Sequence, residues 1–566
     1  MRCRETLSCM AALVLLAFLP GTAHAQKPVD VGHARIVIPG FVEPNTPGAP
    51  GVAVDPKLAA AVTDPAAFDP DGSLNLNKSI YVRFFDKSRS APPEAIVLLV
   101  PELEVGAGSL RIIAKEIVSV SEGRYEAWAL EHRGNLLEDL TDMVAAENQM
   151  TLEASTAALE AYMTHPAGRG GVLANDAFLA TPFASEWGLD VYLRDIRLTV
   201  DKARTITPNV FLGGHALGAV VTQMFAAYDF GDVAGYKLIK GMVLLNGTMD
   251  PVTADPIVDE IYFNGGAGLA GLNQLREPTT RPFQTETNGA PRAPIFQIVQ
   301  IGSQFTIIDR EDTTLQRLLP FFLRFRATNM AFMGLILDDE FQPNPIARVS
   351  IGFLRIPPGK TLADVATRVG NDPAGLNPNG IWAVKDPGPD NIVQWDANIK
   401  DLTPLGPEFI QGREVSTTQA LMRNALLIGA AENEQTSLND TNSNQWFFPK
   451  RLRTDLRKVI DLGATPLSAA AISAQKEKGG NPITLTHNRR VNIPVLAIHA
   501  GQAGSATDQK AFNRYRKTTG IKRGKLTYAE LQFYTHTDLL VSLEQTTVDG
   551  RNAPQLIVDF AKKRLD

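Results

Sequence analysis

The stretch "NVFLGGHALGAVVTQMFAAY", residues 209–228, decides the fold of this chain. It starts with an apolar run of strand type, passes through Gly213 and Gly214, and continues after Gly218 as an apolar segment with helical spacing. Glycine tolerates the backbone angles and the close contacts of a tight turn. The stretch therefore predicts a strand, a sharp turn and a helix, with Ala216 in the turn.

A turn of this kind is typical of a nucleophile elbow, G-x-S-x-G, in which a strained turn exposes a serine hydroxyl above a sheet. The middle residue here is Ala216, which has no nucleophilic atom, so the chain as written predicts no acyl-enzyme chemistry. Three interpretations are open: a Ser-to-Ala inactive variant of a hydrolase, a natural ligand-binding pseudoenzyme, and chemistry that runs through a histidine and a water or oxygen. We favour the first, because Gly214, Gly218 and a candidate histidine are all retained.

The composition is that of a large globular protein. Of 566 residues, 44% are hydrophobic and 20% are charged, so the chain can bury a core in two domains, or in one domain with a large insertion. With a formal net charge of -6 and no dense Lys/Arg stripe, nucleic acid is not an expected partner. The internal stretch nearest to a membrane span, residues 318–337, carries Arg324 and Arg326 near its middle, so we expect no integral membrane span.

The N-terminus has the three parts of a secretory signal peptide. Basic residues precede an apolar run at residues 10–19, and an A-x-A site follows before Gln26. The run is too short for a bilayer, which takes about 20 apolar residues. We therefore expect residues 1–25 to be removed and the mature protein to be secreted or periplasmic. Both cysteines, Cys3 and Cys9, would leave with this peptide, so we expect no disulfide bond.

The rest of the chain alternates strand and helix patterns. Residues 26–74 are rich in Pro, Gly and Asp and predict a loop-dominated lead-in. From residue 79 onward, strand candidates alternate with helix-period segments, which favours an α/β fold with a mainly parallel sheet. This rhythm stops after residues 242–245 and resumes at residues 493–498. The predicted organisation is an α/β core of residues 26–250 and 491–566 and a cap insertion of residues 251–490.

The order of these parts resembles the α/β-hydrolase family in three stretches. "YEAWALEHRG", residues 125–134, is similar to the family's fourth strand and its D-x-R-G turn, with Glu131 in place of the acid. Residues 190–219 are similar to the helix, strand and nucleophile elbow, and "FYTHTDLL", residues 533–540, resembles the loop of the catalytic histidine. The resemblance implies helices on both faces of the sheet and an ester hydrolase of carboxylesterase or lipase type, with a Ser-His-Asp triad.

His536 is the candidate general base. Of the eight histidines, it is the one that follows a strand candidate at the edge of the sheet, in a short loop before a helix. In the chain order of this fold the base comes last, after the nucleophile and the acid. A capping or surface role is the alternative. His215, beside the elbow residue, is expected to point its ring away from the nucleophile side.

Two aspartates compete as the acid that orients this imidazole. Asp250 ends "VLLNGTMD", directly after the strand that follows the elbow, where some members of the family carry the acid. Asp508 follows the next strand, where most members carry it, but it also fits a helix start after Thr507. We favour Asp250, whose alternative is a turn residue before Pro251.

The oxyanion hole is expected to consist of two backbone N–H groups. One would come from Leu217, directly after the elbow residue. The other would come from the loop after the third strand, from Glu102 or Leu103, because Pro101 has no N–H. A carboxylate at Glu102 would repel a developing oxyanion unless another group pairs with it.

No cofactor or metal is expected from the motifs. The stretch "GGAGLAG", residues 265–271, lacks the preceding sheet unit and the acidic residue that dinucleotide binding requires. No Cys/His spacing of a structural zinc site is present.

The insertion is rich in aromatic and apolar residues. If these residues line a pocket, they predict a bulky hydrophobic or aromatic ester as substrate; the alternative is that they form the core of the cap itself.

Overall fold

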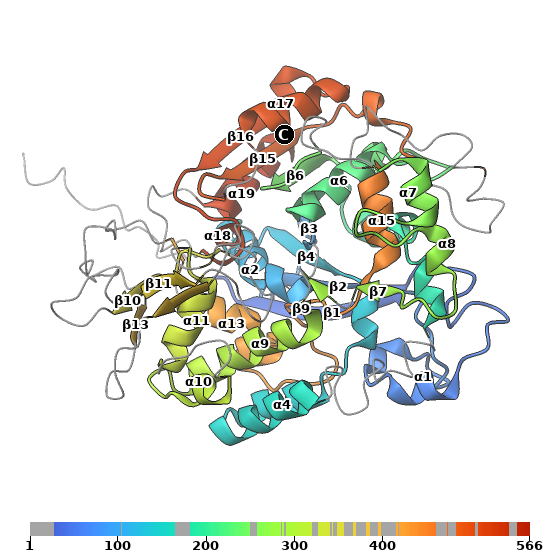
Figure 1. Cartoon of the computed structure of the whole chain (residues 1–566). Coiled ribbons are helices and arrows are strands. Elements are labelled where there is room, and N and C mark those ends of the chain that lie inside the picture. The colour runs from blue at the N-terminus through green and yellow to red at the C-terminus, as the bar shows by residue number, and fades with distance from the viewer. Residues whose placement is uncertain are drawn as a thin grey trace, which may run out of the picture.

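The computed structural model describes most of the chain. It covers residues 28–102, 105–164, 181–249, 257–284, 290–319, 327–339, 348–355, 415–416, 418–459, 483–503, 508–542 and 552–565, together with a few short stretches between residues 286 and 473. These residues form a large sheet that helices flank on both faces (Figure 1).

The large sheet has eight strands in the order β1-β2-β4-β3-β5-β6-β15-β16. The strands are β1 (Val31–Pro39), β2 (Lys78–Asp86), β3 (Ala95–Val100), β4 (Tyr125–Glu131), β5 (Val210–His215), β6 (Gly241–Leu245), β15 (Val495–Ala500) and β16 (Leu526–Leu531). β2 pairs antiparallel with both of its neighbours, and every other pair in this sheet is parallel. This order and this single reversed strand are those of the α/β-hydrolase fold, so the predicted fold class is confirmed.

A hydrophobic cluster covers each face of the sheet. Val97 and Leu99 of β3 belong to one cluster, and Ile96 and Leu98 belong to the other, because successive side chains of a strand point to opposite faces. The first cluster includes residues of α2 (Arg111–Val120) and α19 (Ala553–Leu565); the second includes residues of α5 (Leu189–Arg204), α6 (Leu217–Ala227) and α17 (Gln509–Thr518). β3 is therefore buried on both faces at the centre of the sheet.

The expectation of a loop-dominated lead-in at residues 26–74 is wrong for β1. This strand pairs with β2 along its whole length and forms the edge of the sheet. Its side chains are mostly half-buried, and residues such as Gly32 interrupt the apolar alternation by which strands are recognised. Arg35 of β1 bonds Glu131 at the end of β4 over 3.1 Å. The carboxylate that stands in place of the D-x-R-G acid therefore anchors an edge strand.

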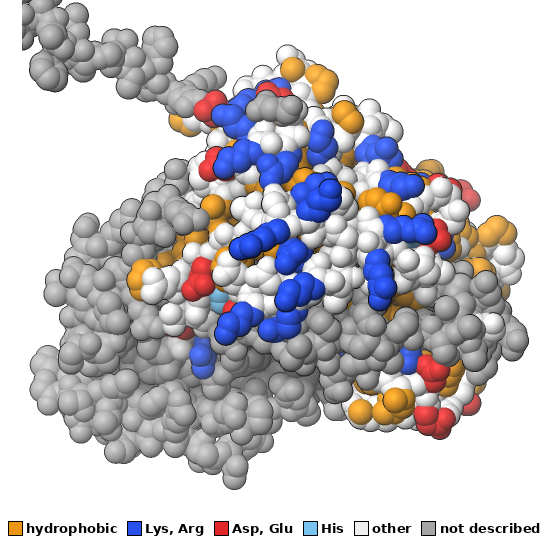
Figure 2. All heavy atoms as spheres, turned by 90° about the horizontal axis from the view of Figure 1, so that it is seen from above, with side chains coloured by type: hydrophobic (Ala, Val, Ile, Leu, Met, Phe, Trp, Pro, Cys, Tyr) orange, Lys and Arg blue, Asp and Glu red, His pale blue; other side chains and the backbone are white. Residues whose placement is uncertain are grey.

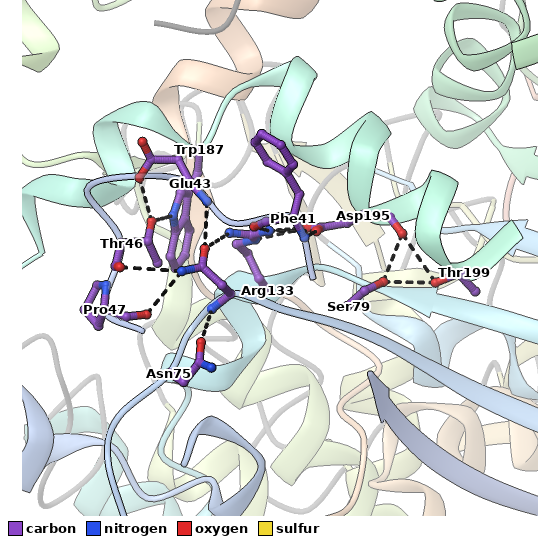
Figure 3. A network of polar contacts seen from close by, with 11 residues as sticks. Phe41, Glu43, Thr46, Pro47, Asn75, Ser79, Arg133, Trp187, Asp195 and Thr199 are labelled. Carbon is purple, nitrogen blue, oxygen red and sulfur yellow. Dashed lines mark hydrogen bonds and ion pairs between the residues drawn. The ribbon is translucent and has the colours of Figure 1, made fainter. Parts of the chain in front are cut away.

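A buried polar network holds the turn after β4 (Figure 3). Arg133 donates to both carboxylate oxygens of Asp195 on α5, over 2.7 to 2.9 Å. The same guanidinium donates to the side chain of Asn77 and to the carbonyl of Phe41. Asp195 also accepts from the backbone N–H of Phe41 over 2.9 Å. The turn, the lead-in and α5 are thus tied together beside the sheet.

Further helices come from the segment before β5 and from the predicted insertion. They are α3 (Thr141–Gln149), α4 (Leu152–Thr164), α7 (Asp259–Asn264), α8 (Leu272–Leu275), α9 (Arg292–Ile308), α10 (Thr314–Leu318), α11 (Asn329–Leu337), α13 (Thr418–Ala425), α14 (Ile428–Ala431) and α15 (Lys450–Val459). α9 packs against α4, where Ser155 bonds Gln304 over 3.0 Å. The boundaries of core and cap stay a prediction.

In the part of the chain that the structure describes, no helix has the length and apolar character needed to cross a bilayer.

The face of the molecule above α17 carries many basic side chains. Figure 2 shows Lys and Arg side chains on this face, interspersed with neutral ones. α17 lies near the top of Figure 1, and this helix and the segment after it have the exposed residues Lys510, Lys517, Lys522 and Arg523. Their positive charges lie among neutral atoms and do not merge into one stripe in this view.

Candidate active site

The predicted strand, turn and helix of the elbow are present. β5 ends at His215, α6 begins at Leu217, and Ala216 between them has φ 48° and ψ −113°. A non-glycine residue held in such a sparsely populated conformation is strained by roughly 1–3 kcal/mol, and strain of this kind clusters at functional sites. The chain therefore has the backbone turn of a nucleophile elbow, but the side chain at this turn is the methyl group of Ala216.

Three glycines let the backbone close around this turn. A Cβ atom on Gly214 would overlap the backbone of Gly218. A Cβ atom on Gly218 would overlap the carbonyl oxygen of Val100, and one on Gly247 would overlap that of Ala216. The sequence pattern identified the first two glycines. Gly247 follows β6, and only the fold shows that it supports the elbow.

Leu217, which the sequence predicts as one oxyanion donor, directly follows the elbow residue. Leu217 is the first residue of α6, where backbone N–H groups lack intrahelical partners and the helix dipole is positive. Its N–H therefore belongs to a helix terminus that favours negative charge. Leu103, the second predicted donor, lies outside the described residues. Its neighbour Glu102 presents a carboxylate at the end of β3.

His536 lies in the loop between β16 and α18 (Asp538–Val541), as the sequence predicts. Its ring is buried between two polar side chains. Nδ1 lies 2.6 Å from Nδ2 of Asn246, and Nε2 lies 3.1 Å from Oε2 of Glu102. Asp538 holds the loop by accepting from the N–H and the hydroxyl of Thr535, and burial raises the pKa of Asp538 to about 6.

The orientation of the Asn246 amide assigns the protons of His536. Oδ1 of Asn246 accepts from the backbone N–H of Ala500 over 3.3 Å, so Nδ2 is the atom that faces His536. Nδ2 donates, and Nδ1 of the ring accepts. A neutral His536 then carries its proton on Nε2 and donates it to Glu102. A serine-hydrolase base uses the opposite tautomer, with Nδ1–H directed at a carboxylate.

Glu102 is an ionised carboxylate between two histidines. Burial would raise the pKa of its carboxyl group, but attraction by His536 and polar contacts with the rings of His215 and His536 lower this pKa to about 2. The sequence analysis noted that an unpaired carboxylate at Glu102 would repel an oxyanion. In the structure this carboxylate is paired with the two histidine rings. It also places a negative group next to the elbow, which opposes an oxyanion there.

The expectation that His215 points away from the nucleophile side is wrong. Its ring packs 4.3 Å from the ring of His536, measured between centroids. Nε2 of His215 donates to the backbone oxygen of His536 over 2.9 Å, and Nδ1 lies 3.4 Å from Oε2 of Glu102. Burial lowers the pKa of His215 and favours the neutral ring. The ends of β3 and β5 meet at the edge where the His536 loop returns, and this arrangement brings the three groups together.

Neither aspartate from the sequence is the described partner of His536. Asp508 caps the N-terminus of α17 by accepting from the N–H of Ala511 over 2.9 Å, which is the structural role that its position also allowed. Asp250 lies outside the described residues. The partner that sequence reasoning missed is Asn246, directly after β6. The sequence shows that Asn246 follows a strand. Because its side chain is an amide, it was not considered as the acid that orients His536.

Comparisons with known proteins leave the reaction open. No protein-family model matches the chain, and no curated protein sequence matches it either. Among solved structures, a monoacylglycerol lipase of Paleococcus ferrophilus is 11% identical with a TM-score of 0.32, and the match covers 86% of this chain and 99% of that one. A peroxisomal α/β-hydrolase of Saccharomyces cerevisiae is 9% identical with a TM-score of 0.31, covering 95% and 91%. A haloalkane dehalogenase variant from Bradyrhizobium elkanii is 9% identical with a TM-score of 0.29, covering 86% and 94%. The fold assignment rests on the strand order and the elbow.

Proposed function

We propose that this protein has the site of an ester hydrolase, that position 216 is the place of its nucleophile, and that Ala216 makes this copy inactive in acyl transfer. The observation that supports the proposal is the backbone of Ala216, with φ 48° and ψ −113° at the junction of β5 and α6. Alanine gains nothing from this conformation, whereas a serine there would present its hydroxyl above the sheet. Leu217 supplies an oxyanion donor at the helix terminus.

His536 is the proposed general base, and its orienting acid is a separate question. We keep Asp250 as the proposed acid, while the described group at Nδ1 is Asn246. The proposed substrate is an ester with a bulky hydrophobic or aromatic group. This choice rests on the apolar and aromatic composition of residues 251–490.

The test is restoration of the nucleophile. The variant Ala216→Ser is expected to hydrolyse p-nitrophenyl esters and to react with a fluorophosphonate probe, and the unchanged chain is expected to do neither. The double variant Ala216→Ser/His536→Ala is the matched control, which should lose the activity. If Ala216→Ser folds as the parent does and shows neither hydrolysis nor labelling, the hydrolase proposal is wrong.

A ligand-binding pseudoenzyme is the second candidate, and Glu102 is the observation that favours it. A carboxylate with a pKa of about 2 beside the elbow opposes the charge that ester cleavage develops. This candidate predicts saturable binding of an apolar ligand by the unchanged chain, with affinity unaltered in His536→Ala. A hydrolase activity of Ala216→Ser that depends on His536 would exclude it.

We also propose that the protein is exported after removal of residues 1–25. The basic start, the short apolar run and the A-x-A site support this. Expression in a Gram-negative host should give a periplasmic protein whose N-terminal sequence begins at Gln26. The variant Ala25→Leu, which places a large side chain at the cleavage site, should leave the precursor uncut. An uncut parent chain in the cytoplasm would contradict the proposal.

A further inference from the structure

Three potential metal ligands converge beside the elbow. One carboxylate oxygen of Glu102 and one ring nitrogen each of His215 and His536 all lie within 4.8 Å of one another. They come from the end of β3, the end of β5 and the loop after β16, and Glu102 and His536 are 434 residues apart in the chain. Two histidines and one glutamate form a ligand set that catalytic zinc sites use, and two histidines with one carboxylate also bind iron(II).

The spacing of the three groups fits a common ion. Oε2 of Glu102 lies 3.1 Å from Nε2 of His536 and 3.4 Å from Nδ1 of His215. With metal–ligand bonds of about 2.0–2.2 Å and tetrahedral angles, neighbouring ligand atoms lie roughly 3.3 Å apart. The two ring nitrogens lie within 4.8 Å of each other and would approach by up to roughly 1.5 Å to complete the site.

The hydrogen bonding of His215 is a second observation. Its ring is 1% exposed, and Nε2 donates to the backbone oxygen of His536. Nδ1 is therefore the ring nitrogen that is left for a ligand. Among the described residues, Nδ1 has no hydrogen-bond partner of good geometry, and it lies 3.4 Å from Oε2 of Glu102. A buried ring nitrogen that is directed at a carboxylate suits a cation held between the two.

The surrounding groups also orient the ligands. Histidines that bind metals usually direct their other ring nitrogen at a carbonyl or carboxylate, and His215 does so through Nε2. His536 would do so if the Asn246 amide turned, because Oδ1 could then accept from Nδ1–H and leave Nε2 to the ion. This turn gives up two contacts of Oδ1, the 3.3 Å bond from Ala500 N–H and the 3.2 Å contact with Nδ1 of His499.

We propose that Glu102, His215 and His536 bind one divalent transition-metal ion of the zinc class next to Ala216. The inference goes beyond the proposed function, and its test requires no ester turnover. With alanine at position 216, no hydroxyl competes for Nε2 of His536, so the ring can serve as a ligand.

The experiment is a metal titration of the full chain made without a histidine tag and stripped with a chelator. We expect one equivalent of Zn²⁺ per chain, and visible d–d absorption when Co²⁺ is used. Glu102→Gln and His215→Ala should each weaken Zn²⁺ binding by at least about 100-fold, since even supporting residues of metal sites affect affinity by 10–100-fold. The control is His487→Gln, which removes another histidine that faces a carboxylate, at 3.6 Å from Asp229. This variant should bind as the parent does.

Two outcomes would overturn the proposal. One is a parent chain that binds less than one equivalent, and the other is a parent whose affinity equals that of Glu102→Gln. If Glu102→Gln does not fold, as judged by circular dichroism, Asn246→Asp replaces it. A carboxylate at position 246 should tighten Zn²⁺ binding about 10-fold by orienting His536, and unchanged or weaker binding would overturn the proposal.

Discussion

Nδ2 of Asn246 lies 2.6 Å from Nδ1 of His536, where the carboxylate of a serine-hydrolase triad would orient the imidazole. An amide donor at this place selects the tautomer with the proton on Nε2. That tautomer must move its proton to Nδ1 before Nε2 can accept a proton from a serine at position 216. The amide of Asn246 therefore disfavours the form of His536 that acts as a base toward the elbow, and Ala216 offers that base no proton to accept.

The first prediction follows from this pair. In the Ala216→Ser background, Asn246→Asp should raise kcat for p-nitrophenyl acetate by about 10-fold or more, because a carboxylate restores the tautomer that general-base catalysis needs. Two further variants complete the test. Asp250→Asn should lower activity if Asp250 is the acid. Asp508→Asn should leave activity and stability nearly unchanged, because asparagine caps a helix about as well as aspartate does. A loss of activity in Asn246→Asp would show that the orienting acid lies elsewhere.

The second prediction concerns strain at the elbow. Ala216→Gly should raise the free energy of unfolding by about 1 kcal/mol, because glycine adopts a φ of 48° without the steric cost that alanine has there. Chemical denaturation measures the change. Ala226→Gly, within α6, is the matched control and should lower the free energy of unfolding by about 1 kcal/mol. If both variants were destabilised alike, the elbow would not be strained.

The third prediction concerns the network in Figure 3. Arg133→Ala should lower the free energy of unfolding by about 3–5 kcal/mol, because it leaves the buried carboxylate of Asp195 without its partner. Arg133→Lys should recover only part of the loss, since lysine cannot form the two-pronged contact. Lys87→Ala, which breaks an exposed pair with Asp30 at 3.7 Å, should change stability by less than about 1 kcal/mol. Equal effects of the buried and exposed variants would contradict this ranking.

The fourth prediction is a pH dependence from Glu147 on α3. Its carboxyl group is buried and accepts from the N–H of Leu427, and burial raises its pKa to about 8. The folded chain then keeps the proton between about pH 4.5 and 8 while the unfolded chain loses it, so stability falls as pH rises through this window, by about 1.4 kcal/mol per pH unit. Glu147→Gln should reduce the slope by about this amount, as urea denaturation at several pH values will show. Glu160→Gln, at an exposed position on α4, is the control and should keep it.

The sequence predicted what depends on local pattern. Two features have recognisable sequence motifs, namely the glycines around Ala216 and the strand–loop–helix context of His536. The structure contains both. β1 was missed because residues such as Gly32 and His33 interrupt its apolar alternation. The contacts of His536 were missed for a different reason. Glu102 and Asn246 each follow a strand, but only the strand order shows that these ends meet the loop after β16.

The pairing of β6 with β15 has a consequence for how the chain acquires its fold. Met242 is in register with Val495, so neighbouring strands near the middle of the sheet are separated by roughly 250 residues, and closing that loop is entropically costly. Such distant pairings form late and slow the folding of a domain. The strands up to β6 must therefore persist with an unpaired edge until the C-terminal strands arrive. A chain cut short before β15 would keep that edge open, as a template for aggregation.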